Sequence, residues 1–88
     1  MVLVKPYFDN GDIRTFDVDE SQDEYVWHRD KEDREVEVLS GDGWQLQIDG
    51  CLPFLLTQGL KFNIPKMTYH RLIKGINRLE VKITKELD

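Results

Sequence analysis

The sequence predicts an all-β domain of eight or nine short antiparallel strands with no long helix. Apolar and polar residues alternate over short runs, as in strands, rather than recurring every three or four residues as in helices. Glycine, proline, asparagine and aspartate interrupt these runs at a spacing of roughly 8–12 residues, which is typical of sandwiches and barrels. The 88 residues suit one domain with a small core, so residues 1–88 are treated as a single domain.

The N-terminal third is expected to hold three strands. The first two cover residues 2–8 and 13–18, on either side of a turn at residues 9–12, and an acidic loop then runs to residue 24. Residues 25–30 form the third strand, in which side chains two positions apart share a face. His28 and Asp30 would therefore point to one side of the strand, with Trp27 and Arg29 on the other.

Six further strands are expected, over residues 34–40, 44–48, 51–56, 60–64, 69–73 and 79–84. The segment at residues 41–43 and the pair at residues 49–50 each predict a hairpin turn. Residues 51–56 are apolar on both faces, so this strand should be covered on both sides. Pro65 has no backbone N–H to donate and ends the strand before it, which places His70 beside a tight corner.

The charges are divided unevenly along the chain. Residues 1–56 carry 5 basic and 14 acidic side chains, a balance of −9, whereas residues 57–88 carry 7 basic and 3 acidic, a balance of +4. An acidic chain is unsuited to general binding of a phosphate backbone, so no nucleic-acid partner is expected. The division would solubilise two faces differently, and it would also suit self-association.

Cys51 is the single cysteine, which excludes an internal disulfide and suits a reducing compartment. The N-terminus lacks the basic and apolar runs of a secretion signal, and no apolar stretch approaches the roughly 18 residues of a membrane span. We therefore expect a cytoplasmic protein with no membrane partner.

Residues 59–74 resemble the second sequence motif of the cupin family. That motif reads Gly, five residues, Pro, one residue, Gly, two residues, His, three residues, Asn. Gly59, Pro65 and His70 match it in register, whereas Met67 and Lys74 replace the middle Gly and the Asn.

Residues 28–41 resemble the first cupin motif, which reads His, one residue, His, three residues, Glu, six residues, Gly. His28 and Gly41 are retained, while Asp30 and Arg34 stand in place of the second His and the Glu. The chain is similar to the cupin tail of type II phosphomannose isomerases and to free-standing cupins of tailed phages, including cyanophages.

This resemblance covers residues 25–84 and implies a cupin jelly-roll barrel, which is often a homodimer and would lie in the host cytoplasm if phage-encoded. It does not carry over isomerase activity, because the catalytic domain of that family is much larger than this chain.

The resemblance also implies a polar site, since cupins usually hold a divalent metal with three His and one Glu. The corresponding set here is His28, Asp30, Arg34 and His70. In one interpretation, His28, Asp30 and His70 bind Fe, Mn, Ni or Zn, as in two-His-one-carboxylate enzymes. In the other, Arg34 forms a bidentate ion pair with Asp30, and both histidines are hydrogen-bonded core residues. Repulsion between the guanidinium group and a bare cation favours the second interpretation.

A third interpretation keeps the pocket without a metal. His28, Arg34 and His70 would then receive a small anionic ligand such as a sugar phosphate or a carboxylate. Three residues would lie near the mouth and suit a sugar-like ligand: Trp44, Gln45 and Gln47. Such a tryptophan is more often a core residue. The sequence thus favours a binding or accessory protein, with a metal-dependent enzyme acting on a sugar phosphate or small acid, isomerase- or oxygenase-like, as the alternative.

Overall fold

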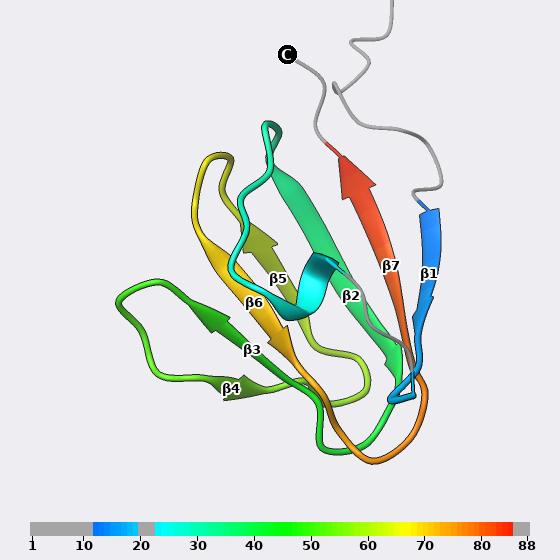
Figure 1. Ribbon diagram of the computed structural model, residues 1–88. Coiled ribbons are helices and arrows are strands. Elements are labelled where there is room, and N and C mark those ends of the chain that lie inside the picture. The colour runs from blue at the N-terminus through cyan, green and yellow to red at the C-terminus, as the bar shows by residue number, and fades with distance from the viewer. Residues whose placement is uncertain (1–11, 20–22, 86–88) are drawn as a thin grey trace, which may run out of the picture.

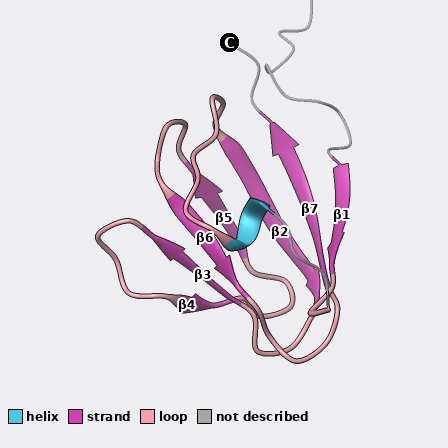
Figure 2. Ribbon diagram, in the orientation of Figure 1, coloured by secondary structure: helices cyan, strands magenta, loops and turns pink. Residues whose placement is uncertain are grey.

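The computed structural model describes residues 12–19 and 23–85 and contains two antiparallel β-sheets (Figure 1). Its strands are β1 (Asp12–Phe16), β2 (Arg34–Ser40), β3 (Gln45–Ile48), β4 (Phe54–Leu55), β5 (Lys61–Ile64), β6 (His70–Ile73) and β7 (Leu79–Lys85). A 3-10 helical turn, η1 (Asp23–Tyr25), is the only helical element of the described ranges (Figure 2). The prediction of an all-β chain is confirmed. No helix in these ranges is long and apolar enough to cross a membrane.

The two sheets differ in size and face each other across the core. One has the strand order β1-β7-β2-β5 and the other the order β4-β3-β6, and all neighbouring strands are antiparallel. The prediction of a closed barrel is therefore wrong, because the strands form two separate sheets. Consecutive strands β2 and β3 lie in different sheets, so residues 41–43 carry the chain across the core and do not form the predicted hairpin.

The core comes from alternating residues of strands that face each other. In β7, Leu79, Val81 and Ile83 are buried, and the residues between them are partly exposed. Trp44, just before β3, is fully buried, and its indole Nε1 donates a hydrogen bond of 2.5 Å to the backbone carbonyl of Asn77. The alternation in the sequence thus identified the inner face of the last strand correctly.

The predicted strand over residues 25–30 is largely wrong. Tyr25 ends η1, and its ring packs at 6.4 Å from Phe16 and 5.9 Å from Trp44, measured between ring centroids. Only His28 pairs with a neighbouring strand, through an isolated antiparallel bridge to His70. Because the aromatic core draws Tyr25 inward, the segment becomes extended only after residue 26. The predicted strand over residues 2–8 lies outside the described residues, which hold seven strands against eight or nine predicted.

The prediction for residues 51–56 is also wrong. Only Phe54 and Leu55 form a strand, β4, which pairs with β3 alone. Leu52 is 87% exposed and Cys51 is exposed, so this apolar run is not covered on both sides. The Asp49-Gly50 pair does lie in the loop between antiparallel strands β3 and β4, as predicted.

We expect replacement of Gly75 by alanine to destabilise the fold by about 3 kcal/mol, because overpacking against backbone atoms cannot relax easily. A Cβ at Gly75 would overlap the carbonyl oxygen of Asp42 and lie 2.6 Å from the backbone nitrogen of Trp44. Gly50→Ala is the matched control, since a Cβ there meets no atom within 4 Å and only its φ of +80° is unfavourable. Equal losses in urea unfolding free energy for the two variants would contradict the packing around Gly75.

Candidate metal site

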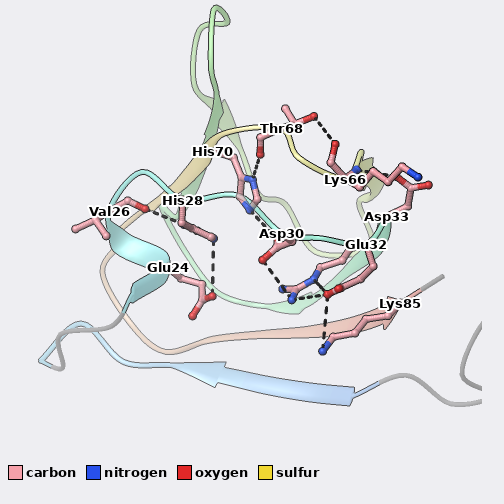
Figure 3. Close-up of polar contacts among 11 residues, drawn as sticks. Glu24, Val26, His28, Asp30, Glu32, Asp33, Lys66, Thr68, His70 and Lys85 are labelled. Carbon is pink, nitrogen blue, oxygen red and sulfur yellow. Dashed lines mark hydrogen bonds and ion pairs between the residues drawn. The ribbon is translucent and has the colours of Figure 1, made fainter. Parts of the chain in front are cut away.

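Two histidines meet at the edge of the three-stranded sheet. His28 donates a backbone hydrogen bond of 3.0 Å to the carbonyl of His70, and the His70 backbone N–H returns one of 2.8 Å. Residues that oppose each other directly in an antiparallel pair place their side chains on the same face. The imidazole rings accordingly lie 4.3 Å apart between centroids, at 60° to each other (Figure 3).

Asp30 is held beside these rings by the corner after β5. The backbone N–H of Met67 donates to the carbonyl of Asp30 at 2.6 Å, and that of Thr68 donates to Pro65 at 3.3 Å. Met67 adopts a φ of 62°, in the left-handed region that favours glycine. The corner thereby brings Asp30 next to His70.

The backbone determines which ring nitrogen of each histidine is free. Nδ1 of His28 lies 2.8 Å from the carbonyl oxygen of Val26, and Nδ1 of His70 lies 2.8 Å from that of Thr68 (Figure 3). A carbonyl only accepts, so each neutral ring carries its proton on Nδ1 and leaves a lone pair on Nε2. Metal-binding histidines in proteins commonly have this second contact.

The free electron pairs converge on one point. The Nε2 atom of His70 lies 3.4 Å from Oδ2 of Asp30, and the ligand atoms of His28, Asp30 and His70 all lie within 4.8 Å of one another. His28 Nε2 and Asp30 Oδ2 are buried and have no hydrogen-bond partner. Buried acceptors without partners are rare in proteins, so these atoms form a place where a proton, a water molecule or a cation can be bound.

Burial lowers the pKa of His70 below its ordinary value of 6.5, and this outweighs the hydrogen bond to Thr68, which acts in the opposite direction. The nearby Arg34 guanidinium also lowers this pKa, while the carboxylate of Asp30 raises it. Burial therefore favours the neutral form of the His70 ring, which is the form that can bind a metal ion.

The lowered pKa of His70 makes the protein less stable in mild acid. Between the native pKa and 6.5, the unfolded chain binds a proton that the folded chain does not. The unfolding free energy therefore decreases as the pH is lowered, by at most about 1.4 kcal/mol per pH unit. His70→Gln should flatten this decline between about pH 7 and pH 5, with a chelator present. Parallel pH profiles of the unfolding free energy in the two proteins would contradict the shift.

Arg34 takes part in the site differently from the prediction. Its Nη2 lies 3.3 Å from Oδ1 of Asp30, so the expected ion pair is present. The contact through two guanidinium nitrogens, however, is made with Glu32, whose Oε1 accepts from Nε at 3.1 Å and Nη2 at 2.9 Å. Lys85 approaches the same oxygen at 4.0 Å. Arg34 thus occupies one oxygen of Asp30 and leaves Oδ2 directed at the histidines.

A small cavity adjoins the site between the two sheets. Its volume is about 50 Å³, and most of its lining consists of apolar core side chains. His28, His70, Arg34 and Glu24 form its polar part. Oε2 of Glu24 lies 3.8 Å from Nε2 of His28, which makes it a further oxygen close to that candidate ligand. The site could therefore hold a cation with room beside it for a molecule of a few atoms.

The other three predicted pocket residues lie elsewhere. Trp44 is part of the core, as its more common role suggested. Gln45 and Gln47 alternate with the buried Leu46, so they lie on the outer face of β3. Gln47 accepts a hydrogen bond there from Nε of Arg71 at 3.0 Å. None of the three lines the cavity between the sheets.

Sequence reasoning missed Glu24 and Glu32 as members of the site. Ser21 and Glu24 have the spacing of one capped helical turn, and such a turn is what makes the four-residue spacing between Glu24 and His28 a signal of contact. Glu32 lies in a run of charged residues, 31–35, in which no single carboxylate stands out from the sequence. Comparison of the chain with family models, with curated proteins and with solved structures gives no match.

Proposed function

We propose that the protein binds one divalent transition-metal ion through Nε2 of His28, Nε2 of His70 and Oδ2 of Asp30. The observation that carries the proposal is the convergence of these three atoms within 4.8 Å, two of them buried without a hydrogen-bond partner. Two imidazoles and one carboxylate form a ligand set that suits Fe, Mn, Ni or Zn.

The proposal includes a cupin-type jelly roll as the finer description of the fold. Support comes from the retained Gly59, Pro65 and His70, from the two antiparallel sheets, and from the left-handed backbone at Met67. In this description, the site uses Asp30 in place of the usual second histidine, and Arg34 in place of the usual glutamate. Arg34 then acts as a positioning residue, because it holds one oxygen of Asp30 and leaves the other free.

The function supported best is that of a small metal-dependent binding protein for a small anion. A metal held by three protein ligands keeps open positions and supplies Lewis-acid chemistry. A cavity of about 50 Å³ is far below the volume of about 300 Å³ or more typical of sites for larger ligands. A carboxylate or another anion of a few atoms therefore suits the site better than a sugar phosphate. An enzyme acting on such a small acid is the alternative.

A second candidate is a salt-bridged polar core with no ligand, favoured by the contact of 3.3 Å between Arg34 and Asp30. Metal titration separates the two candidates. The full chain, freed of metal with a chelator and dialysed, should bind one equivalent of Zn²⁺ or Co²⁺ by calorimetry. It should also be stabilised against unfolding by the added metal, because a ligand of the native state alone raises stability. No stoichiometric binding of either ion would support the polar core instead.

A further inference from the structure

The segment Trp27–His28–Arg29 forms an outer edge of the three-stranded sheet. It lies beside β6, and it approaches that strand through the His28–His70 bridge. In this bridge the backbone N–H of His28 donates to the carbonyl of His70, and the backbone N–H of His70 donates to the carbonyl of His28. In an antiparallel pair, the residues on either side of such a position direct their N–H and C=O groups away from the neighbouring strand.

The outward backbone groups of this edge are unused. Within residues 12–19 and 23–85, the backbone N–H and C=O groups of Trp27 and Arg29 make no hydrogen bond. Both residues are exposed, Trp27 by 44% of its surface. The segment carries no proline, and its one charged side chain, Arg29, is held over the ring of Tyr69 rather than projecting freely from the edge. It therefore presents backbone donors and acceptors that fit another extended chain.

The side chains on the outer face form alternating cation–aromatic pairs. Because His28 opposes His70, Trp27 opposes Arg71, and Arg29 opposes Tyr69. The guanidinium carbon of Arg71 lies 5.0 Å from the ring centroid of Trp27, and that of Arg29 lies 5.2 Å from that of Tyr69. Trp, Tyr and Arg are the residue types that contribute most to protein interfaces.

We propose that a second copy of this chain pairs with this edge, antiparallel and centred on His28. In that register, Trp27 faces the partner's Arg29, and Arg29 faces the partner's Trp27. Each of these two pairs exchanges two backbone hydrogen bonds, which use the free groups of Trp27 and Arg29. On the outer face, each indole meets the partner's guanidinium, so the pairing repeats the cation–aromatic alternation already present with β6.

The choice of a second copy follows from this self-complementarity. A two-fold contact needs a surface that matches itself, and a segment with an aromatic residue and a cation on either side of its centre has this property. An unrelated extended peptide could use the same backbone groups, but it would not supply the matched aromatic and cation. The inference goes beyond the proposed metal site, and its test is carried out with a chelator present so that no metal links the copies.

Sedimentation equilibrium of the full chain, with a chelator and a reducing agent, should show a monomer–dimer equilibrium over a concentration series. Arg29→Pro removes an N–H that has no partner in the monomer but is needed in the dimer, so it should leave only monomer. Arg29→Ala is the matched control because it keeps the N–H. This variant should still form dimers. Because it loses the two cation–aromatic contacts between the copies, its dissociation constant should rise by about 5- to 30-fold.

Amide hydrogen exchange supplies a readout that needs no variant and decides the matter if Arg29→Pro does not fold. Exchange at Trp27 and Arg29 should slow as the concentration of the wild-type protein rises, while that of Gly50, in the exposed β3–β4 loop, should not change. The inference is overturned by a wild-type protein that is monomeric throughout. A dimer that persists in Arg29→Pro, or one that leaves exchange at Trp27 and Arg29 unchanged, overturns it as well.

Discussion

Asp30→Asn should abolish stoichiometric metal binding while leaving the metal-free protein at least as stable as the wild type. The amide lacks the negative charge that favours binding of a divalent ion. Loss of a residue that only supports a metal ligand lowers metal affinity by about 10- to 100-fold, and loss of the ligand charge itself should lower it further. At the same time, the amide nitrogen can donate to Nε2 of His70, which lies 3.4 Å from Oδ2 in the wild type. Its oxygen can still accept from Arg34.

This substitution separates the two accounts of the site by the sign of its effect on stability. If Asp30 serves mainly as the partner of Arg34, removing its charge weakens a half-buried ion pair and lowers the unfolding free energy. Asp49→Asn is the matched control, because Asp49 is exposed and does not line the cavity. Calorimetric titration and urea unfolding of the three proteins, each freed of metal first, measure both effects. A destabilised Asp30→Asn protein whose wild-type parent binds no metal would reverse our assignment.

Trp44→Ala should produce the largest loss of stability in the chain, about 3–5 kcal/mol. The side chain is fully buried, and truncation leaves a cavity as well as an unpaired carbonyl on Asn77. A domain of this size has a total stability of only about 5–10 kcal/mol, so the variant should be close to unfolding at room temperature. Thermal unfolding followed by circular dichroism should give a melting temperature lower by about 12–40 °C.

Leu52→Ala is the control for this loss. Leu52 is the most exposed large apolar residue of the part of the chain that the structure describes, and its truncation should change the unfolding free energy by less than about 0.5 kcal/mol. Trp44→Phe should fall between these two, since it keeps most of the buried volume but loses the hydrogen bond. A Trp44→Ala protein as stable as the Leu52→Ala protein would show that Trp44 lies at the mouth of a pocket rather than in the core.

Where alternation has one physical cause, sequence reasoning predicted the structure. β2 and β7 each bury every second residue because a single face packs on the opposite sheet. The corner after Pro65 was also predicted, because a missing N–H donor has the same effect in any context. The structure brings the side chains of His28, Asp30, Arg34 and His70 together, since the bridge between His28 and His70 preserves the strand parity on which that grouping depends.

The errors arose where tertiary contacts override local pattern. Nothing within residues 25–30 reveals that Tyr25 will pack on Phe16 and Trp44, which come from distant parts of the chain. Likewise, an apolar run such as residues 51–56 is compatible with burial, but whether another layer covers it depends on the whole topology. Sheet membership is also set by long-range pairing, so the Gly-rich turn at residues 41–43 could not reveal that it joins two different sheets.

The central claim is that two unprotonated Nε2 atoms and one carboxylate oxygen form a binding site for a cation. Long-range proton–nitrogen NMR of the imidazole rings tests it most directly, because it reports which ring nitrogen carries the proton. We predict that both histidines of the metal-free protein are protonated on Nδ1 near pH 7. Addition of one equivalent of Zn²⁺ should then shift the Nε2 resonance of both rings. Protonation of either ring on Nε2, or Nε2 signals that do not respond to Zn²⁺, would contradict the account.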